Sequence, residues 1–248
     1  MKFWEDVPNR VFVFGSNQAG VHGGGAARFA RENFGAVMGF GEGMTGSAYA
    51  LPTKVTVAET MTLPAIREAV DRFLAYAAAH PESWFQVTAV GCGLAGLSAK
   101  DIAPMFRDAP ENCRLPGVWY RILNPDAYTP QIIVAGSRGI LDSQLVFGKL
   151  DRTLVNLRDR GMEIVSGLAS GPDQLGKEWA ELHNIKTALF PADWKRFGKQ
   201  AGFIRNQDMS WYGTHLVAFW DMQSSGTRNM IETAQRDGLH VRVIQVQR

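Results

Sequence analysis

Apolar residues along this chain fall into short runs that alternate with longer segments of helical spacing. Apolar runs of about four to eight residues favour buried strands, whereas apolar positions three and four residues apart favour helices. In the first half this pattern predicts strands at 11–14, 48–51 and 85–90 and helices at 23–34, 63–79 and 99–106. The clearest apolar face lies on the helix at 63–79 and consists of Ile66, Val70, Phe73, Leu74 and Ala77. We therefore expect layers of parallel strands and helices.

The second half alternates more regularly than the first. The pattern predicts strands at 132–135, 163–166, 187–190, 215–220 and 241–246 and helices at 143–160, 172–183, 201–211 and 227–237. Each helix is long enough to cross between two parallel strands, so we expect a Rossmann-like, doubly wound parallel sheet. Ligands of such sheets bind at the carboxyl ends of the strands.

A stretch with three prolines, Leu115–Pro130, separates the two halves. We expect it to hold the last strand of the first half and then a linker, because proline lacks a backbone donor and disfavours helix at the residue before it. The boundary is placed near residues 125–129. The prediction is an α/β chain of two domains, at 1–127 and 128–248.

Composition and charge narrow the class of protein. The 248 residues are 46% hydrophobic and 20% charged, which is typical of globular domains. A net charge of +2 disfavours a sequence-independent nucleic-acid binder. The two cysteines cannot build a disulfide framework, and no signal peptide or membrane span is visible. We expect a cytoplasmic protein without a membrane partner. Self-association into a homo-oligomer stays open.

Each half also contains a strand, a glycine-rich turn and a helix in succession, at Arg10–Gly35 and Pro130–Leu154. Glycine lets backbone N–H groups approach a ligand closely, and a helix N-terminus favours an anion. Such turns are also common as purely structural features. Three consecutive glycines at a helix start cost stability without a packing gain, which favours a binding role. Two such units in one chain predict nucleotide chemistry.

Three motifs of the first half are separated but ordered: GSNQAGVHGGGAA at 15–27, GSAYALPTK at 46–54 and VGCGLAGLSAKDIAPMF at 90–106. In this order and spacing the segment resembles the macro domain, an ADP-ribose-binding, three-layer α/β fold. The resemblance implies that Asn17 meets the distal ribose of the ligand. It further implies two phosphate loops, one formed by Gly23, Gly24 and Gly25 and the other by Gly91, Gly93 and Gly96.

Four motifs of the second half are AGSRG at 135–139, SGLASGPDQLGKEWA at 166–180, GFIRNQDM at 202–209 and FWDMQSSGTRNMI at 219–231. They resemble the nucleotide-binding SLOG superfamily, which includes the Lonely-guy phosphoribohydrolases and DNA-processing protein A. The resemblance implies that phosphate is contacted by the first turn, by a glycine before the next helix and by a later helix start. The residues concerned are Gly136, Ser137, Arg138, Gly171, Ser225, Gly226 and Thr227.

The Lonely-guy catalytic glutamate has no counterpart in this chain. The loop reads Gly226 to Met230 where that glutamate would fall, and Glu232 comes one turn too late. Cleavage of a nucleotide N-glycoside by that route is therefore not expected, because no carboxylate stabilises the ribosyl centre. Asp173 and Arg205 are the candidate catalytic residues, and Asp221 is an alternative source of the acid. Asp173 also has a structural explanation as an acid in a first helical turn.

Three classes of function follow from these patterns. The first is an enzyme acting on ADP-ribose, NAD or a derived nucleotide, and the second is a non-catalytic sensor or sponge for such a ligand. The third, handling of single-stranded DNA, is disfavoured by the net charge, although the basic residues Lys195, Arg196, Lys199 and Arg205 leave a local basic face open. No metal or cofactor is predicted. Most tryptophans fit packing roles, while Trp194 and Trp220 lie where an aromatic ring could stack on a base.

Overall fold

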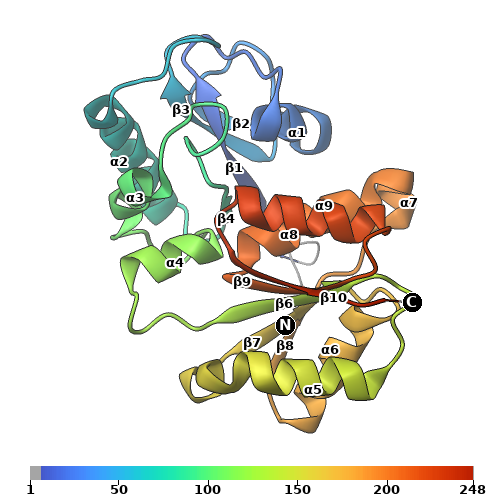
Figure 1. The fold of residues 1–248 in the computed structure, drawn as a ribbon. Helices are drawn as coiled ribbons and strands as arrows, with labels where there is room; N and C mark the ends of the chain where they lie inside the picture. The colour runs from blue at the N-terminus through green and yellow to red at the C-terminus, as the bar shows by residue number, and fades with distance from the viewer. Residues whose placement is uncertain (1–6, 248) are drawn as a thin grey trace. The chain divides into compact units, whose positions relative to one another are not determined.

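The computed structural model describes residues 7–247, which form two compact units. Residues 7–123 are called the N-terminal domain here, and residues 124–247 the C-terminal domain. Each domain contains its own five-stranded sheet (Figure 1). The expected α/β class with two parallel-rich sheets is confirmed. The division falls at residue 123, slightly before the boundary expected from the prolines.

The sheet of the N-terminal domain has the strand order β2-β3-β1-β4-β5. Its strands are β1 (Arg10–Asn17), β2 (Gly43–Thr45), β3 (Ala48–Lys54), β4 (Trp84–Val87) and β5 (Cys113–Arg114). β1 pairs in parallel with β3 and β4, and β4 with β5, while the short β2 runs antiparallel to β3. The pairing of β1 with β3 becomes irregular between Ser16 and Asn17, where the first glycine-rich loop begins. β2 was not expected from the sequence.

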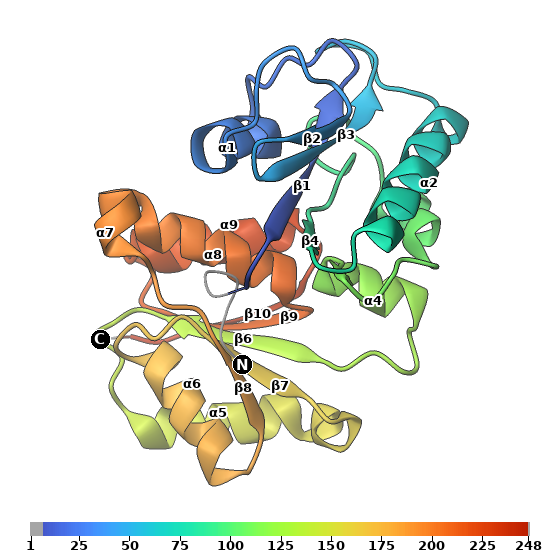
Figure 2. The ribbon, with the colours of Figure 1, turned by 180° about the vertical axis from the view of Figure 1, so that it is seen from behind.

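Helices cover both faces of this sheet, as expected for three layers (Figures 1 and 2). They are α1 (Gly25–Phe34), α2 (Leu63–Ala79), α3 (Ala99–Ile102) with the 3-10 turn η2 (Ala103–Phe106), and α4 (Gly117–Leu123). α1 packs on the face of Phe12, whose ring stacks on Phe34 at a centroid distance of 4.6 Å. The other helices contribute to the core around Val11 and Val13 on the opposite face. Successive residues of β1 thus pack against helices on opposite faces of the sheet.

One element of the first half differs from its prediction. The strand expected at the start of Leu115–Pro130 is the helix α4, and the last strand, β5, precedes it. Pro116 accepts hydrogen bonds from the N–H groups of Trp119 and Tyr120, which starts the helix. A short apolar run fits either a buried strand or a buried helix, and burial of Trp119 among core residues favours the helix.

The sheet of the C-terminal domain is entirely parallel, with the order β10-β9-β6-β7-β8. Its strands are β6 (Gln131–Gly136), β7 (Glu163–Ser166), β8 (Lys186–Leu189), β9 (His215–Trp220) and β10 (His240–Gln245). From β6 the chain steps outward to β7 and β8, and it then returns to add β9 on the other side of β6. This doubly wound order matches the prediction. The reversal places a topological switch point between β6 and β9.

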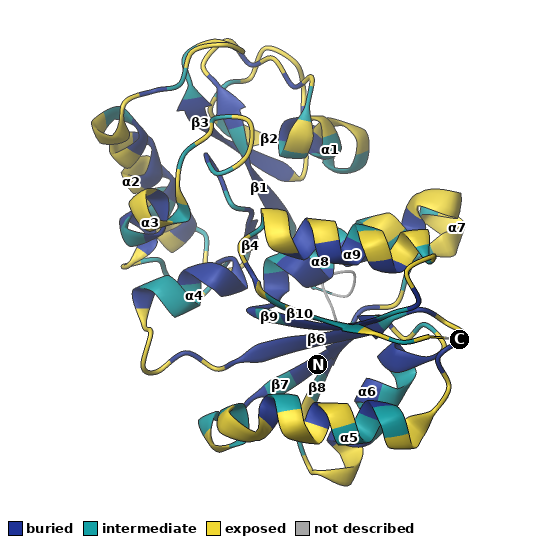
Figure 3. Ribbon diagram, viewed as in Figure 1, coloured by how far each residue is buried: buried dark blue, intermediate teal, exposed yellow. Residues whose placement is uncertain are grey.

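Helices also cover both faces of the second sheet (Figures 1 and 2). They are α5 (Ser143–Leu154) with η3 (Val155–Arg160), α6 (Pro172–Leu182), α7 (Trp194–Phe197) with η4 (Gly198–Gln200), α8 (Ala201–Tyr212) and α9 (Ser225–Arg236). α5 and α6 share a core with Ile132 and Val134, and α8 and α9 lie on the other face. In both sheets the central strands are largely buried, whereas the edge strand β10 has no buried residue, and exposed residues lie in the loops and on the outer sides of the helices (Figure 3). Among residues 7–247, no helix combines the length and apolar character of a membrane span.

Candidate functional site

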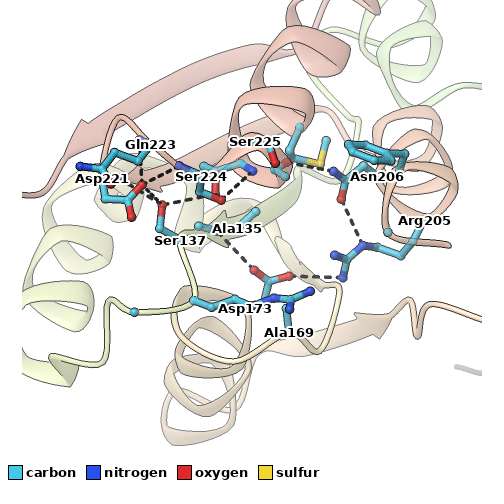
Figure 4. Close-up of a pocket in the computed structure, with 18 of the residues that line it drawn as sticks. Ala135, Ser137, Ala169, Asp173, Arg205, Asn206, Asp221, Gln223, Ser224 and Ser225 are labelled. Carbon is cyan, nitrogen blue, oxygen red and sulfur yellow. Dashed lines mark hydrogen bonds and ion pairs between the residues drawn. The ribbon is translucent and has the colours of Figure 1, made fainter. Parts of the chain in front are cut away.

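A cavity of about 560 Å³ opens in the C-terminal domain at the carboxyl ends of β6 and β9 (Figure 4). It therefore lies at the switch point of the sheet, where doubly wound proteins bind their ligands. The cavity collects most of the residues that the sequence singled out in this half. Its lining includes Gly136, Ser137, Arg138, Asp173, Arg205, Ser225, Gly226 and Thr227.

The turn after β6 is fixed by close packing. The N–H of Gly136 donates to Oδ1 of Asp173 at 3.2 Å, and the N–H of Ser137 donates to the Phe219 carbonyl at 2.9 Å. A β-carbon at Gly136 would lie only 2.5 Å from the Phe219 oxygen and from Cγ of Pro172. Gly136 is thus required by the approach of β9 and α6. Its N–H group and that of Ser137 are already used within the protein.

Asp221, at the carboxyl end of β9, organises the loop that leads into α9. Its carboxylate accepts hydrogen bonds from the Ser137 hydroxyl at 2.7 Å and from the N–H groups of Gln223 and Ser224 at 3.0 and 2.9 Å (Figure 4). Ser224 then caps α9 by accepting from the N–H of Thr227 at 3.3 Å. The Thr227 hydroxyl also donates to Ser224. These side chains therefore hold the loop in shape.

Four backbone N–H groups at the cavity have no acceptor within residues 7–247, namely those of Arg138, Gly139, Ser225 and Gly226. Two of them belong to the turn after β6 and two to the first turn of α9. A β-carbon at Gly226 would meet nothing within 4 Å, so the backbone there is open to an incoming group. Convergent N–H groups at a turn and a helix N-terminus form an anion-binding arrangement.

Asp173 and Arg205 form an ion pair at the cavity, with Oδ2 and Nη1 3.5 Å apart. Asp173 is only 2% exposed, and burial raises the pKa of its carboxyl to about 6. Arg205 and the N–H groups of Gly136, Gly167 and Ala169 oppose that shift because they favour the charged form. Burial likewise lowers the pKa of Arg205, and Asp173 opposes that change. The carboxyl therefore titrates closer to neutrality than an ordinary aspartate.

The guanidinium of Arg205 is held from several sides. It donates to the Gly167 carbonyl and, through Nε, to Oδ1 of Asn206 at 3.1 Å. The Asn206 amide in turn donates to the Gly226 carbonyl at 3.2 Å and to Oδ1 of Asn229 at 3.0 Å. A continuous set of polar contacts thus joins α6, α8 and α9 (Figure 4). Asn206 was missed as a site residue although it lies in the GFIRNQDM motif beside Arg205.

Gly171 is the one residue of the expected phosphate set in this half that does not line the cavity. It has a φ of +81°, and a β-carbon there would lie 3.0 to 3.1 Å from the carbonyls of Ser137, Arg138 and Ile140. Its place is behind the turn, which it supports by close packing. Another wall of the cavity is formed by Trp194, Lys199, Gly202 and Phe203, which were not among the expected phosphate contacts.

In the N-terminal domain, the two glycine loops follow the adjacent strands β1 and β4. Leu94 of the second loop reaches the first, because its Cδ1 atom lies 3.1 Å from the β-carbon position of Gly24 and 3.5 Å from that of Gly25. Gly91 and Gly96 have positive φ values of +77° and +71°. Nothing lies within 4 Å of the β-carbon positions of Gly23, Gly93 and Gly96. The loops predicted to act together therefore lie together.

Residues of the three first-half motifs brace these loops. Nζ of Lys54 donates to the carbonyls of Val57 at 2.5 Å and Leu94 at 3.4 Å. The Asn17 amide donates to the Val21 carbonyl at 2.8 Å and accepts from its N–H at 3.0 Å. Asn17, expected to meet a ribose, is thus used to close its own loop.

Comparison with known proteins places the C-terminal domain in a class. Residues 130–197 match the sequence model of the family described as the YspA, cpYpsA-related SLOG family, so this domain is of SLOG type. The Gene 61 protein of Mycobacterium phage D29 is 33% identical over 117 residues, which span 45% of this chain and 93% of the phage protein. The chain belongs to the family of that phage protein.

The solved structure of DNA processing protein A from Streptococcus pneumoniae is also similar, at 17% identity and a TM-score of 0.39. The match covers 75% of this chain and 76% of the other.

Proposed function

We propose that the C-terminal domain binds the phosphate groups of a nucleotide in the cavity between the β6 turn and the start of α9. The observation that carries this proposal is the set of four N–H groups without a protein acceptor, at Arg138, Gly139, Ser225 and Gly226. Their hydrogen-bonding capacity is satisfied by water or by an anionic ligand. Phosphate oxygens supply several acceptors at once, and the dipole of α9 favours their negative charge.

The charged side chains around the cavity favour binding of an anionic ligand. Both carboxylates of the lining have partners, since Asp173 pairs with Arg205, and Asp221 accepts hydrogen bonds from the Ser137 hydroxyl and from two N–H groups of its own loop. Arg138 and Lys199 are exposed cations of the same lining. Arg138 lies in the first turn, where its planar guanidinium matches two phosphate oxygens.

A substitution of Arg138 tests this proposal directly. Calorimetry on the full chain with ADP-ribose, NAD, AMP and pyrophosphate is expected to show binding that Arg138→Ala weakens by about 1.5 to 3 kcal/mol, the range of a charge-assisted hydrogen bond. Lys149→Ala is a matched control, because Lys149 is an exposed cation of α5 outside the cavity. Equal affinity of the wild type and Arg138→Ala for every ligand contradicts the proposal.

We further propose that the ligand class is ADP-ribose or another NAD-derived nucleotide, held by the N-terminal domain between its two glycine loops. Support comes from the open positions at Gly23, Gly93 and Gly96 and from the contact of Leu94 with the other loop. A diphosphate needs convergent backbone donors without β-carbons in the way. We accordingly propose that the N-terminal domain is macro-like.

Holding the nucleotide is favoured over cleaving it. Asp173 is buried and paired with Arg205, so its carboxylate does not stand free at the cavity surface. A sensor or sponge fits these contacts. Hydrolysis is the second candidate, and its support is the raised pKa of Asp173, which permits proton transfer near neutral pH.

A further inference from the structure

The cavity of the C-terminal domain has a second wall whose chemistry differs from that of the phosphate side. Trp194 follows β8, and Phe203 lies in the first turn of α8. Both line the cavity, yet Trp194 is 53% exposed and Phe203 is 48% exposed. Large aromatic side chains that are exposed to solvent beside polar groups are typical of binding sites for flat, amphipathic ligands.

The position of Trp194 is built by local structure. Asp193 caps α7 by accepting from the N–H of Arg196 at 2.9 Å, and the N–H of Trp194 donates to the Ala192 carbonyl at 3.0 Å. Cη2 of Trp194 lies 3.6 Å from the β-carbon position of Gly202, which is an ordinary van der Waals distance. The indole is therefore held against α8 at the cavity.

From this geometry we infer that Trp194 and Phe203 form a nucleobase subsite, which makes the ligand a small nucleotide rather than a sugar phosphate alone. The inference rests on the proposed phosphate site and deepens it. The phosphates meet the β6 turn and the α9 N-terminus, and the base stacks on the aromatic wall. Stacking accepts any base, because every base offers a π-face.

The test compares ligands that share a phosphate but differ in the base. Calorimetry on the full chain uses inorganic phosphate, ribose 5-phosphate and the monophosphates of adenosine, guanosine, cytidine and uridine. At least one monophosphate is expected to bind about tenfold more tightly than ribose 5-phosphate, in line with the contribution of one stacked base. Trp194→Ala removes that gain and leaves the affinity for ribose 5-phosphate unchanged. Phe203→Ala is expected to act in the same direction.

Leu182→Ala serves as the control, because Leu182 is an exposed apolar residue at the end of α6 and lies outside the cavity lining. Equal affinity for ribose 5-phosphate and all monophosphates overturns the base subsite and leaves the phosphate site standing. Loss of ribose 5-phosphate binding in Trp194→Ala overturns it as well. Absence of binding by every ligand overturns both proposals. Tighter, steeply salt-dependent binding of an oligonucleotide overturns the assignment to a small nucleotide.

Discussion

Oδ2 of Asp173 lies 3.5 Å from Nη1 of Arg205, and this buried pair connects the start of α6 with α8 at the carboxyl edge of the second sheet. The same carboxylate accepts from the N–H of Gly136, so it also touches the turn proposed to hold phosphate. Its protonation therefore affects both the fold and the proposed site.

The first prediction concerns stability against pH. Burial raises the pKa of Asp173 from 3.8 to about 6, so the folded state keeps a proton that the unfolded state releases between these values. This proton therefore contributes on the order of 2 to 3 kcal/mol to the free energy of unfolding below about pH 4. The contribution is lost as pH rises to about 6. Urea unfolding of the wild type and Asp173→Asn at pH 4, 5, 6 and 7 measures this. The unfolding free energy of the wild type is expected to fall relative to that of Asp173→Asn as pH rises across that window. A difference independent of pH contradicts the assignment.

A second prediction links the same group to ligand binding. An anion in the cavity favours protonated Asp173, so affinity is expected to fall as pH rises through about 6. ADP-ribose is a suitable probe because its diphosphate lacks the monoester ionisation near pH 6, and the Gly24→Val background removes the contribution of the site proposed in the N-terminal domain. We expect affinity up to about tenfold higher at pH 5 than at pH 7.5, equal to a shift of about one pKa unit. Asp173→Asn should flatten the profile. An equally steep profile in that variant assigns the titration to another group.

Two glycines of the cavity provide a matched pair for the third prediction. Gly136→Ala brings its β-carbon within 2.5 Å of the Phe219 carbonyl, so we expect destabilisation of about 1 to 3 kcal/mol. Gly226→Ala meets no atom within 4 Å and lies in a helix, where alanine is the more favourable residue. It should keep or raise the thermal midpoint while weakening phosphate binding, because its methyl group enters the proposed anion site. Unchanged affinity in Gly226→Ala argues against phosphate at that helix start.

The N-terminal domain gives the fourth prediction. Gly24→Val places branched carbons beside Leu94, since the β-carbon position already lies 3.1 Å from its Cδ1 atom. We expect loss of ADP-ribose binding at this domain with no loss of fold, because the neighbour is the flexible end of a side chain. Calorimetry on Gly24→Val in the background of Arg138→Ala isolates this site from the other. Unchanged affinity in that folded variant contradicts the ADP-ribose proposal.

Periodicity predicted the elements with long or repetitive patterns and failed where tertiary contacts decide. The helix at 63–79 and the strands at 163–166 and 215–220 have the expected bounds. α4 was predicted as a strand, because the segment around Trp119 is short and mostly apolar, and no period separates the alternatives. In the candidate site, the sequence motifs identified Asp173 and Arg205, which both line the cavity. Gly136 packs against β9 and Gly171 packs against the β6 turn, and each of these contacts joins residues that lie far apart in the sequence.

The last prediction concerns catalysis. Met230, rather than a carboxylate, lines the cavity where the Lonely-guy glutamate would fall, and Glu232 is exposed and outside the lining. Release of free base from AMP is therefore expected to be absent or very slow, since no ionised acid is free to stabilise the ribosyl centre. Chromatography of adenine formed by the wild type, Asp173→Asn and Asp221→Asn measures it. Any release that is seen should depend on Asp173, whose raised pKa suits proton transfer, while the Asp221 carboxylate is occupied by hydrogen bonds from Ser137 and from two N–H groups of its own loop. Rapid release by the wild type would mean that the missing glutamate matters little. Full activity in Asp173→Asn would remove that residue from the mechanism.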